Sequence, residues 1–281
     1  MATIEYDPSR KALYSPELRE TVFVEGQTYS PMQVAIEAAR LAYYRAEQTA
    51  SERQRLADAL ARVGFGELQL FAHAETGTQG FGAVRANDRN VLISFRGTQP
   101  DEVTDLATDL HAETVAWTAG GNVHKGFATA AQGLLPQLRA WLQQRSDVGS
   151  LILTGHSLGA ALATLAASVL RPTLLITMGS PRVGNAAFAA SLADIDGARI
   201  VDCCDAVTQV PPEIPAYTHI RPPTYITREG TKVENPGADT IDGDRLRARA
   251  EYLFKYAWRI GTVLVRDLAD HAPINYVRVF F

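Results

Sequence analysis

A short motif near the middle of the chain could present a nucleophile. It reads Gly155-x-Ser157-x-Gly159, with an apolar run before it that favours a buried strand and a small-residue run after it that favours a tightly packed helix. A serine on such a sharp strand-to-helix turn has a strained backbone, and the two glycines relieve the crowding around it. The pattern predicts a nucleophile elbow, with the backbone N–H of Leu158 aimed at a developing oxyanion.

A serine hydroxyl reacts only when a base takes its proton, and the base needs a carboxylate to hold it. In α/β-hydrolases these groups follow the serine in the order acid, then histidine. Asp205 ends a predicted strand, where this architecture places chemistry, and Asp202 within that strand is the alternative acid. His271, in a loop after a predicted helix, is the preferred base, and His219 in a proline-rich passage stays open as the other candidate.

The elements around this motif alternate between strands and helices. We expect helices from the Ser30 N-cap to about Ala46, from the Ser51 cap to Val63-Gly64, over 126–145, after the elbow, and over 185–193. We expect strands at 68–72, 80–86, 91–95, 151–153, 173–178 and 198–203, and a loop over 228–243. This alternation predicts an α/β fold with a mostly parallel sheet and helices on both faces. We expect one domain over residues 1–281.

Composition narrows the class of protein. The 281 residues include 46% hydrophobic and 21% charged residues, values typical of globular proteins. A net charge of −4 gives no indication of nucleic-acid binding. No run of 18 apolar residues predicts a membrane span, and the start lacks the pattern of a signal peptide. Two adjacent cysteines, Cys203 and Cys204, read as packed thiols in a reducing compartment. We therefore expect a cytoplasmic protein, or a secreted one if a signal segment has been removed.

Six stretches, in order, resemble the motifs of the class 3 lipase family, the fungal-type triacylglycerol lipases and their bacterial and plant relatives. The stretches are Ile93 to Thr98, Val123 to Phe127, Thr154 to Ala160, Gly179 to Asn185, Asp205 to Val207 with Pro211-Pro212, and Asp270-His271. The resemblance runs from about Ser30 to the C-terminus. It implies an α/β-hydrolase fold and a lipase or esterase that cleaves esters or acylglycerols through an acyl-enzyme, with no cofactor and no metal.

Position by position, the resemblance implies Ser157 as nucleophile, Asp205 as acid and His271 as general base. It implies Thr98 and Leu158 as backbone oxyanion donors. It also matches His219 with a structural histidine of the family, and it suggests that Arg96 and Arg182 position loops through salt bridges. Two other classes stay open: a lipase-like binding or signalling module without turnover, and an acyltransferase or peptidase on the same fold.

The chain departs from the family pattern in two places. Asp202 stands where the family often has Asn, which predicts a second carboxylate near the acid. The stretch 101–110, at the position of the fungal lid, is acidic and lacks a large aromatic residue.

The segment from Asp244 to Asp267 has an apolar stripe at helical spacing. The stripe consists of Leu246, Ala250, Leu253, Ala257, Ile260 and Leu264. One interpretation is a helix packed on the sheet. The other is a helical cap at about 244–268 that covers the acyl pocket, with Phe254 and Trp258 binding substrate. The basic charge of such a cap would suit transient contact with a lipid interface.

Overall fold

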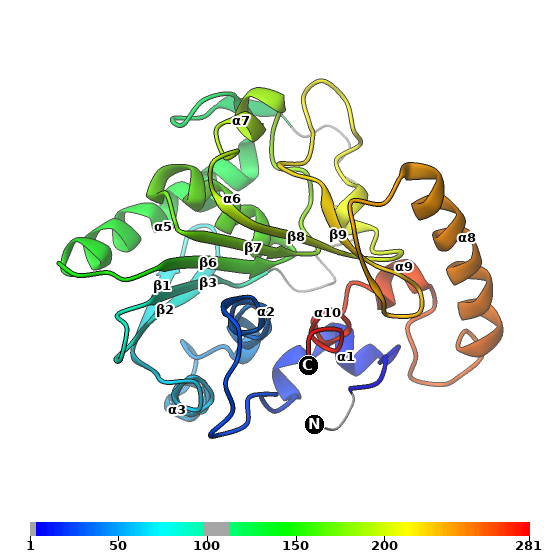
Figure 1. Ribbon diagram of the computed structural model, residues 1–281, viewed down its shortest axis with the longest axis horizontal. Coiled ribbons are helices and arrows are strands. Elements are labelled where there is room, and N and C mark those ends of the chain that lie inside the picture. Colours follow the sequence, from blue (N-terminus) through cyan, green and yellow to red (C-terminus); the bar gives the residue numbers. More distant parts are fainter. Residues whose placement is uncertain (1–3, 98–112) are drawn as a thin grey trace.

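The computed structural model describes residues 4–97 and 113–281. An eight-stranded sheet crosses the molecule in the order β1-β2-β3-β6-β7-β8-β9-β10 (Figure 1). The strands are β1 Phe65–His73, β2 Thr78–Arg85, β3 Val91–Phe95, β6 Leu151–His156, β7 Leu174–Met178, β8 Asp196–Asp202, β9 Pro223–Ile226 and β10 Lys232–Glu234. The run from β3 to β9 is parallel and both edges are antiparallel, which confirms the predicted mostly parallel sheet.

Helices cover both faces of this sheet (Figure 1). On one face lie α5 Lys125–Gln143, α6 Leu158–Leu170 and α7 Ala186–Ala190, next to a small ribbon of β4 Thr114–Ala116 and β5 Asn122–His124. On the other face lie α1 Arg10–Tyr14, α2 Pro31–Leu41, α3 Ala50–Ala61 and α10 Pro273–Val277. Beyond β9 stand α8 Ala238–Lys255 and α9 Arg266–Ala269.

The central strands are apolar at consecutive positions because each face of the sheet has its own core. In β6, Ile152 packs into the core beneath α2, whereas Leu153 packs into the core beneath α5 and α6. Ile176 and Leu175 in β7 divide between the two cores in the same way. Side chains that alternate along these strands therefore point into two apolar cores, one on each face of the sheet. Neither face of these strands is exposed to solvent. Among the described helices, none combines the length and the apolar character needed to cross a bilayer.

The predicted ends of the helices are confirmed in part. Ser30 caps α2 with a reciprocal capping box to Gln33, and the helix passes into a 3₁₀ turn that stops at Arg45, a left-handed residue with φ 51°. The expected Ser51 cap is wrong. Thr49 caps α3 instead, because its extended backbone lets its hydroxyl accept from the N–H of Glu52.

The second half contains the largest differences from expectation. The expected loop 228–243 instead contains edge strand β10 and the beginning of α8. The expected helix 244–267 is also wrong, because α8 ends at Lys255. The chain then turns through Gly261, with φ 86°, and pairs with the N-terminal segment between Ser9 and Thr262. This turn interrupts the predicted apolar stripe. Four residues of the stripe are exposed rather than packed on the sheet: Leu246, Leu253, Ile260 and Leu264. The single domain stays a prediction.

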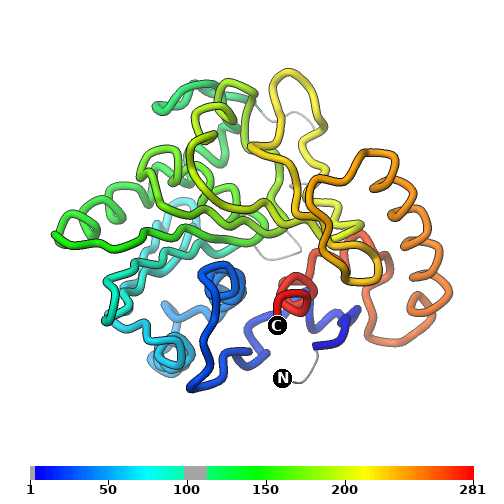
Figure 2. The backbone as a smooth tube through the Cα atoms, in the orientation of Figure 1, coloured from blue at the N-terminus to red at the C-terminus, as the bar shows by residue number. Residues whose placement is uncertain are grey.

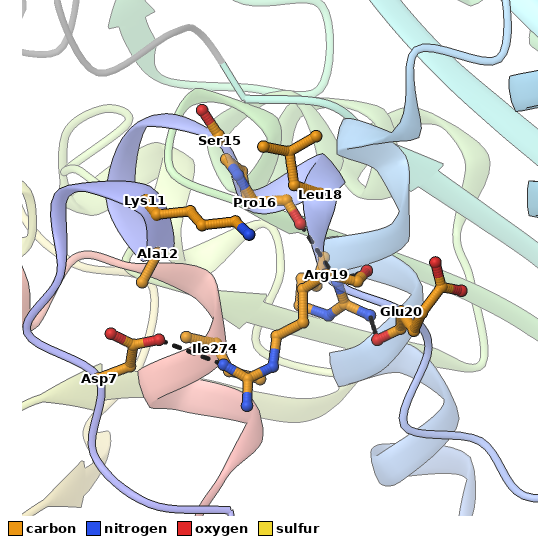
Figure 3. A pocket seen from close by; sticks show the side chains of 10 residues that line it. Asp7, Lys11, Ala12, Ser15, Pro16, Leu18, Arg19, Glu20 and Ile274 are labelled. Carbon is orange, nitrogen blue, oxygen red and sulfur yellow. Dashed lines mark hydrogen bonds and ion pairs between the residues drawn. The ribbon is translucent and has the colours of Figure 1, made fainter.

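The two ends of the described chain lie side by side (Figures 1 and 2). The amide of Asn275 in α10 accepts from the N–H of Asp7 at 2.9 Å and donates to its carbonyl at 2.9 Å. A cavity of about 280 Å³ lies beside this junction, with the Asp7–Arg19 ion pair on one side and Ile274 of α10 in its wall (Figure 3). The N-terminal segment thus braces the helix that follows His271.

A buried ion pair anchors α2 to the segment before it. Arg40 and Glu37, both fully buried, pair at 2.6 Å. The remaining guanidinium donors of Arg40 reach the carbonyl oxygens of Pro16, Arg19 and Glu20 at 3.0–3.3 Å. A buried charge is tolerated only when it is paired and hydrogen-bonded in this way.

Arg40→Met should lower the free energy of unfolding by about 3–5 kcal/mol, because it leaves the buried Glu37 carboxylate without its cationic partner, with only the Thr21 hydroxyl and the Val22 N–H still donating to it. Urea denaturation followed by circular dichroism measures this loss. Arg53→Met, at an exposed arginine of α3, is the matched control and should change stability by less than about 0.5 kcal/mol. A loss below about 1 kcal/mol for Arg40→Met would show that the pair contributes little.

Candidate active site

The strand-to-helix turn at Ser157 has the strained geometry that the motif predicts. Ser157 lies between β6 and α6 with φ 60° and ψ −131°. A Cβ on Gly155 would lie 2.2 Å from the carbonyl oxygen of Gly159, and a Cβ on Gly159 would lie 2.2 Å from that of Phe95. Only glycine fits at these two positions, because backbone atoms cannot move aside. The turn therefore fixes the serine side chain at the end of β6.

His271 connects this serine to a carboxylate. Its Nε2 lies 2.9 Å from Ser157 Oγ, and its Nδ1 lies 2.8 Å from Asp205 Oδ2. All three side chains are buried. A hydroxyl beside an imidazole that is itself held by a carboxylate is the arrangement that activates a serine for attack on a carbonyl. The sequence left two acids and two histidines as candidates. The structure brings Asp205 and His271 together with Ser157.

Two further donors hold the Asp205 carboxylate. The N–H of Val207 donates to Oδ1 at 2.9 Å, and the hydroxyl of Tyr276 donates to Oδ2. Burial, followed by the charge of Asp205, raises the pKa of Tyr276 well above its usual value, so the phenol stays protonated and can donate. Sequence reasoning assigned no role to Tyr276. Its position five residues after His271, one turn into α10, was the available signal.

His219 and Arg182 both bind the backbone that follows Asp205. Nε2 of His219 lies 2.8 Å from the carbonyl oxygen of Thr208, to which the ring N–H donates. Burial, assisted by neighbouring arginines, lowers the pKa of His219 well below its usual value, so the ring is neutral. Arg182 donates to the carbonyl oxygens of Gln209 and Pro211 at 2.7 and 2.8 Å, contacts shorter than its 3.5 Å pair with Glu213. Arg96, in contrast, forms the expected kind of ion pair, with Glu47 at 2.7 Å.

His156 packs against His271 with the two rings tilted, and among the described residues it forms no hydrogen bond to the Ser157 hydroxyl. Its ring centroid lies 4.5 Å from that of His271, and Tyr43 OH lies 2.9 Å from its Nδ1. Burial and the neighbouring His271 lower the pKa of His156 well below its usual value. A neutral ring here avoids repulsion when His271 takes up a proton.

The predicted second carboxylate, Asp202, is fully buried, and neither of its oxygens has a hydrogen-bond partner among the described residues. Burial, followed by the charge of Asp270, raises the pKa of Asp202 well above its usual value. A protonated aspartic acid is uncharged and similar in shape to an asparagine side chain. Asp202, at a position where the family often has Asn, therefore adds no full negative charge beside Asp205.

Asp270, next to His271, lies in a cluster that the sequence did not reveal. Within the described part of the chain, the thiols of Cys203 and Cys204 and a carboxylate oxygen of Asp270 lie within 4.8 Å of one another, close enough to surround a metal ion. The carboxylate of Asp270 already accepts from Tyr6 OH at 2.7 Å, Arg266 Nε at 3.0 Å and the N–H of Cys204 at 3.0 Å. These bonds fix the residue that precedes His271.

The remaining predicted site residues differ in where the structure places them. Thr98 and the stretch 101–110 lie outside the described residues. Leu158 is the first residue of α6, where a backbone N–H has no acceptor within the helix. Phe254 and Trp258 are exposed, and the indole of Trp258 donates to the carbonyl oxygen of Phe254 at 3.0 Å. No hydrogen bond or ring contact among the described residues joins either aromatic side chain to the Ser157 site.

The fold matches that of solved fungal lipases, which have the α/β-hydrolase fold. A lipase from Rhizopus microsporus var. chinensis is 24% identical with a TM-score of 0.58, over 84% of this chain and 86% of that one. The triacylglyceride lipase of Rhizomucor miehei is 20% identical with a TM-score of 0.58, over 90% and 99% of the two chains. At these identities the likeness concerns the fold.

The sequence comparison identifies the family of one segment of the chain. The model of the family "Lipase (class 3)" matches residues 92–214, so this segment is a class 3 lipase segment, and within it the assignment made from the motifs is confirmed. The chain is 34% identical to secreted mono- and diacylglycerol lipase 1 of Fusarium solani, over 52% of this chain and 48% of that protein. It is 32% identical to secreted mono- and diacylglycerol lipase A of Penicillium camembertii, over 60% and 59%.

The chain thus spans about half to three fifths of the length of these curated relatives. Both relatives are named as secreted proteins, so the comparison does not support the cytoplasmic expectation.

Asp202→Asn should make stability less dependent on pH. Because the pKa of Asp202 is raised in the folded state, folding requires proton uptake once the pH exceeds 3.8, the carboxyl's ordinary pKa. Stability from this group is therefore complete below that pH and is lost as the pH rises toward the folded-state pKa. At pH 4 the free energy of unfolding of the variant should equal that of the unmodified protein. Above pH 4 the variant should become more stable than the unmodified protein by up to about 1.4 kcal/mol per pH unit.

Urea denaturation at pH 4, 5, 6 and 7 measures this difference. Glu25→Gln, at an exposed acid, is the control and should show no pH-dependent gain. An Asp202→Asn gain that is equal at all four pH values would contradict a protonated Asp202.

Proposed function

We propose that this protein is a serine carboxylic-ester hydrolase, a lipase or esterase, that acts through an acyl-enzyme. The observation that carries the proposal is the position of His271, within hydrogen-bond distance of both Ser157 Oγ and Asp205 Oδ2. Its class 3 lipase segment supports the same reaction class.

In the proposed reaction Ser157 Oγ attacks the ester carbonyl while His271 Nε2 takes the hydroxyl proton. Asp205 stabilises the resulting imidazolium and keeps the ring oriented through Nδ1. His271 then protonates the leaving alcohol, which leaves the acyl group on Ser157. Water attacks this ester by the same route in reverse, with His271 as base, and releases the carboxylic acid.

The oxyanion of each tetrahedral intermediate needs donors that are in place before the reaction. We assign the N–H of Leu158 to this role, since it lies at the N-terminus of α6 next to the nucleophile. The backbone N–H of Thr98 is proposed as the second donor from the sequence pattern alone.

We propose acylglycerols as the substrate class, because the relatives named above are mono- and diacylglycerol lipases. The test compares hydrolysis of p-nitrophenyl esters from acetate to palmitate with release of fatty acid from emulsified mono-, di- and triacylglycerol. Activity on acylglycerols supports the proposal, and activity on acetate ester alone would restrict it to a soluble-ester esterase. Absence of hydrolysis across the panel would favour a binding module, and acyl transfer to added alcohols in preference to water would favour an acyltransferase.

Ser157→Ala should reduce ester hydrolysis to background, and Asp205→Asn and His271→Ala should each lower kcat by several orders of magnitude, because the three groups act as one unit. His219→Ala is the matched histidine control and should keep substantial turnover, since its ring binds the Thr208 carbonyl rather than the serine. Steady-state kinetics on p-nitrophenyl butyrate measure all four. An inactive His219→Ala with an active His271→Ala would reverse the assignment of the base.

Tyr276→Phe should lower kcat about tenfold with little change in KM. The variant removes one donor to Asp205, worth about 1–1.5 kcal/mol, but leaves the ring packing intact. Tyr225→Phe, at another buried tyrosine that bonds Asp244 instead, is the control. Equal losses for both tyrosines, or a rise in KM alone, would argue against a positioning role for Tyr276.

A further inference from the structure

The end of α8 and the turn after it expose an unusual number of large apolar side chains. We call residues 252–265 the α8 tip. Phe254 is 85% exposed, Trp258 72% and Ile260 105%, and Leu253 and Leu264 are also more than half exposed. Because Ile260 is as exposed as it would be in an extended chain, its side chain projects away from the molecule. Clustered apolar exposure of this kind marks an interaction surface.

The α8 tip is held in place although its large side chains face outward. The N–H of Arg10 donates to the carbonyl oxygen of Gly261 at 2.8 Å, and the N–H of Val263 donates to that of Pro8 at 2.8 Å. Inside the turn, the buried hydroxyl of Tyr252 donates to the carbonyl oxygen of Val263 at 2.7 Å. The projecting side chains are therefore presented by a fixed backbone, which reduces the entropy lost on binding.

The charge of the α8 tip is entirely positive. Residues 252–265 contain Lys255 and Arg259 and no aspartate or glutamate. Neither cation forms an ion pair within the described residues, and both lie over aromatic rings of the tip, Lys255 over Tyr256 at 5.0 Å and Arg259 over Trp258 at 5.4 Å. The whole chain carries a net charge of −4, so the tip is a local basic site on an acidic protein.

We infer that the α8 tip docks onto an anionic lipid bilayer. A projecting group of aliphatic and aromatic side chains with two unpaired cations can insert among acyl chains while the cations contact lipid phosphates. Tryptophan and arginine suit this boundary, because each combines an apolar body with a polar end. A protein partner would instead need a cavity that accepts Ile260 and a group of acids that matches the cations. The α8 tip lies at the outer edge of the molecule beyond β9 (Figure 1).

This docking surface goes beyond the proposed hydrolysis and does not depend on it, since no residue of the tip belongs to the Ser157 site. It gives the exposed aromatics a role other than the expected lining of an acyl pocket, which stays a prediction.

Trp258 supplies a direct readout, because Trp117 and Trp141 are buried and Trp258 is exposed. The experiment uses the full chain with Ser157→Ala, so that no lipid is hydrolysed, and vesicles of phosphatidylcholine with or without 30% phosphatidylglycerol, a composition on the order of that of anionic membranes. We expect co-sedimentation with the anionic vesicles and a blue shift of tryptophan emission, both reduced by added salt.

Leu253→Ser/Ile260→Ser/Leu264→Ser retains Trp258 as reporter and should lower the partition coefficient at least about tenfold. Val24→Ser/Val148→Ser, at exposed valines outside the tip, is the matched apolar control and should bind normally. Lys255→Gln/Arg259→Gln should weaken binding to anionic vesicles about fivefold per charge, and the exposed pair Arg53→Gln/Arg139→Gln should have a much smaller effect.

Lack of partition by the starting protein, or equal losses in the tip and control variants, would overturn the inference. So would a dimer, detected by sedimentation velocity, that the triple variant converts to monomer, since the tip would then be a contact between copies. Unfolding curves check that each variant is folded. Failure of docking is distinguishable from failure of the proposed reaction, because binding is measured without catalysis.

Discussion

The tight crossing of backbone at the turn between β6 and α6 is the constraint on which the Ser157 site depends. Glycines 155 and 159 allow the strand and the helix to approach within a distance that no Cβ permits, and Gly97 at the end of β3 does the same against the carbonyl oxygen of His156. The parallel pairing of β3 with β6 and of β6 with β7 holds these segments together. Ser157 adopts its strained backbone conformation, with φ 60° and ψ −131°, within this crossing.

The surroundings of the site are kept largely uncharged. Burial favours the neutral forms of His156, Asp202 and Tyr276, each of which lies near His271 or Asp205. Asp205, in contrast, accepts from the N–H of Val207, the hydroxyl of Tyr276 and the ring of His271. In a medium of low polarity, a carboxylate with several donors can balance a developing imidazolium without competing charges nearby.

The sequence alone predicts the central elements because their signals are local. The two glycines around Ser157, the apolar runs of β3 and β7 and the Ser30 cap each act through neighbours a few residues away. It does not predict β9 and β10, which are short, or the end of α8, which depends on pairing with the distant N-terminal segment. The bond from Tyr6 to Asp270 is also a product of tertiary contact and had no local signal, whereas the bond from Tyr276 to Asp205 had only the short spacing between Tyr276 and His271.

The pairing of Asp7 with Asn275 joins residues 268 positions apart, and Tyr6 contacts Asp270, which precedes His271. A ribosome makes the chain from one end, so Asp7 emerges long before its partner exists. The sheet, the elbow and the loop after Asp205 can assemble while synthesis continues, but His271 follows Ser157 by 114 positions, and the segments of Asp7 and Asn275 meet only after it has been made. Such distant pairing slows folding, because a large loop has to close before the contact forms. A partly synthesised chain can thus contain Ser157, the proposed nucleophile, while it lacks His271, the group proposed to activate it.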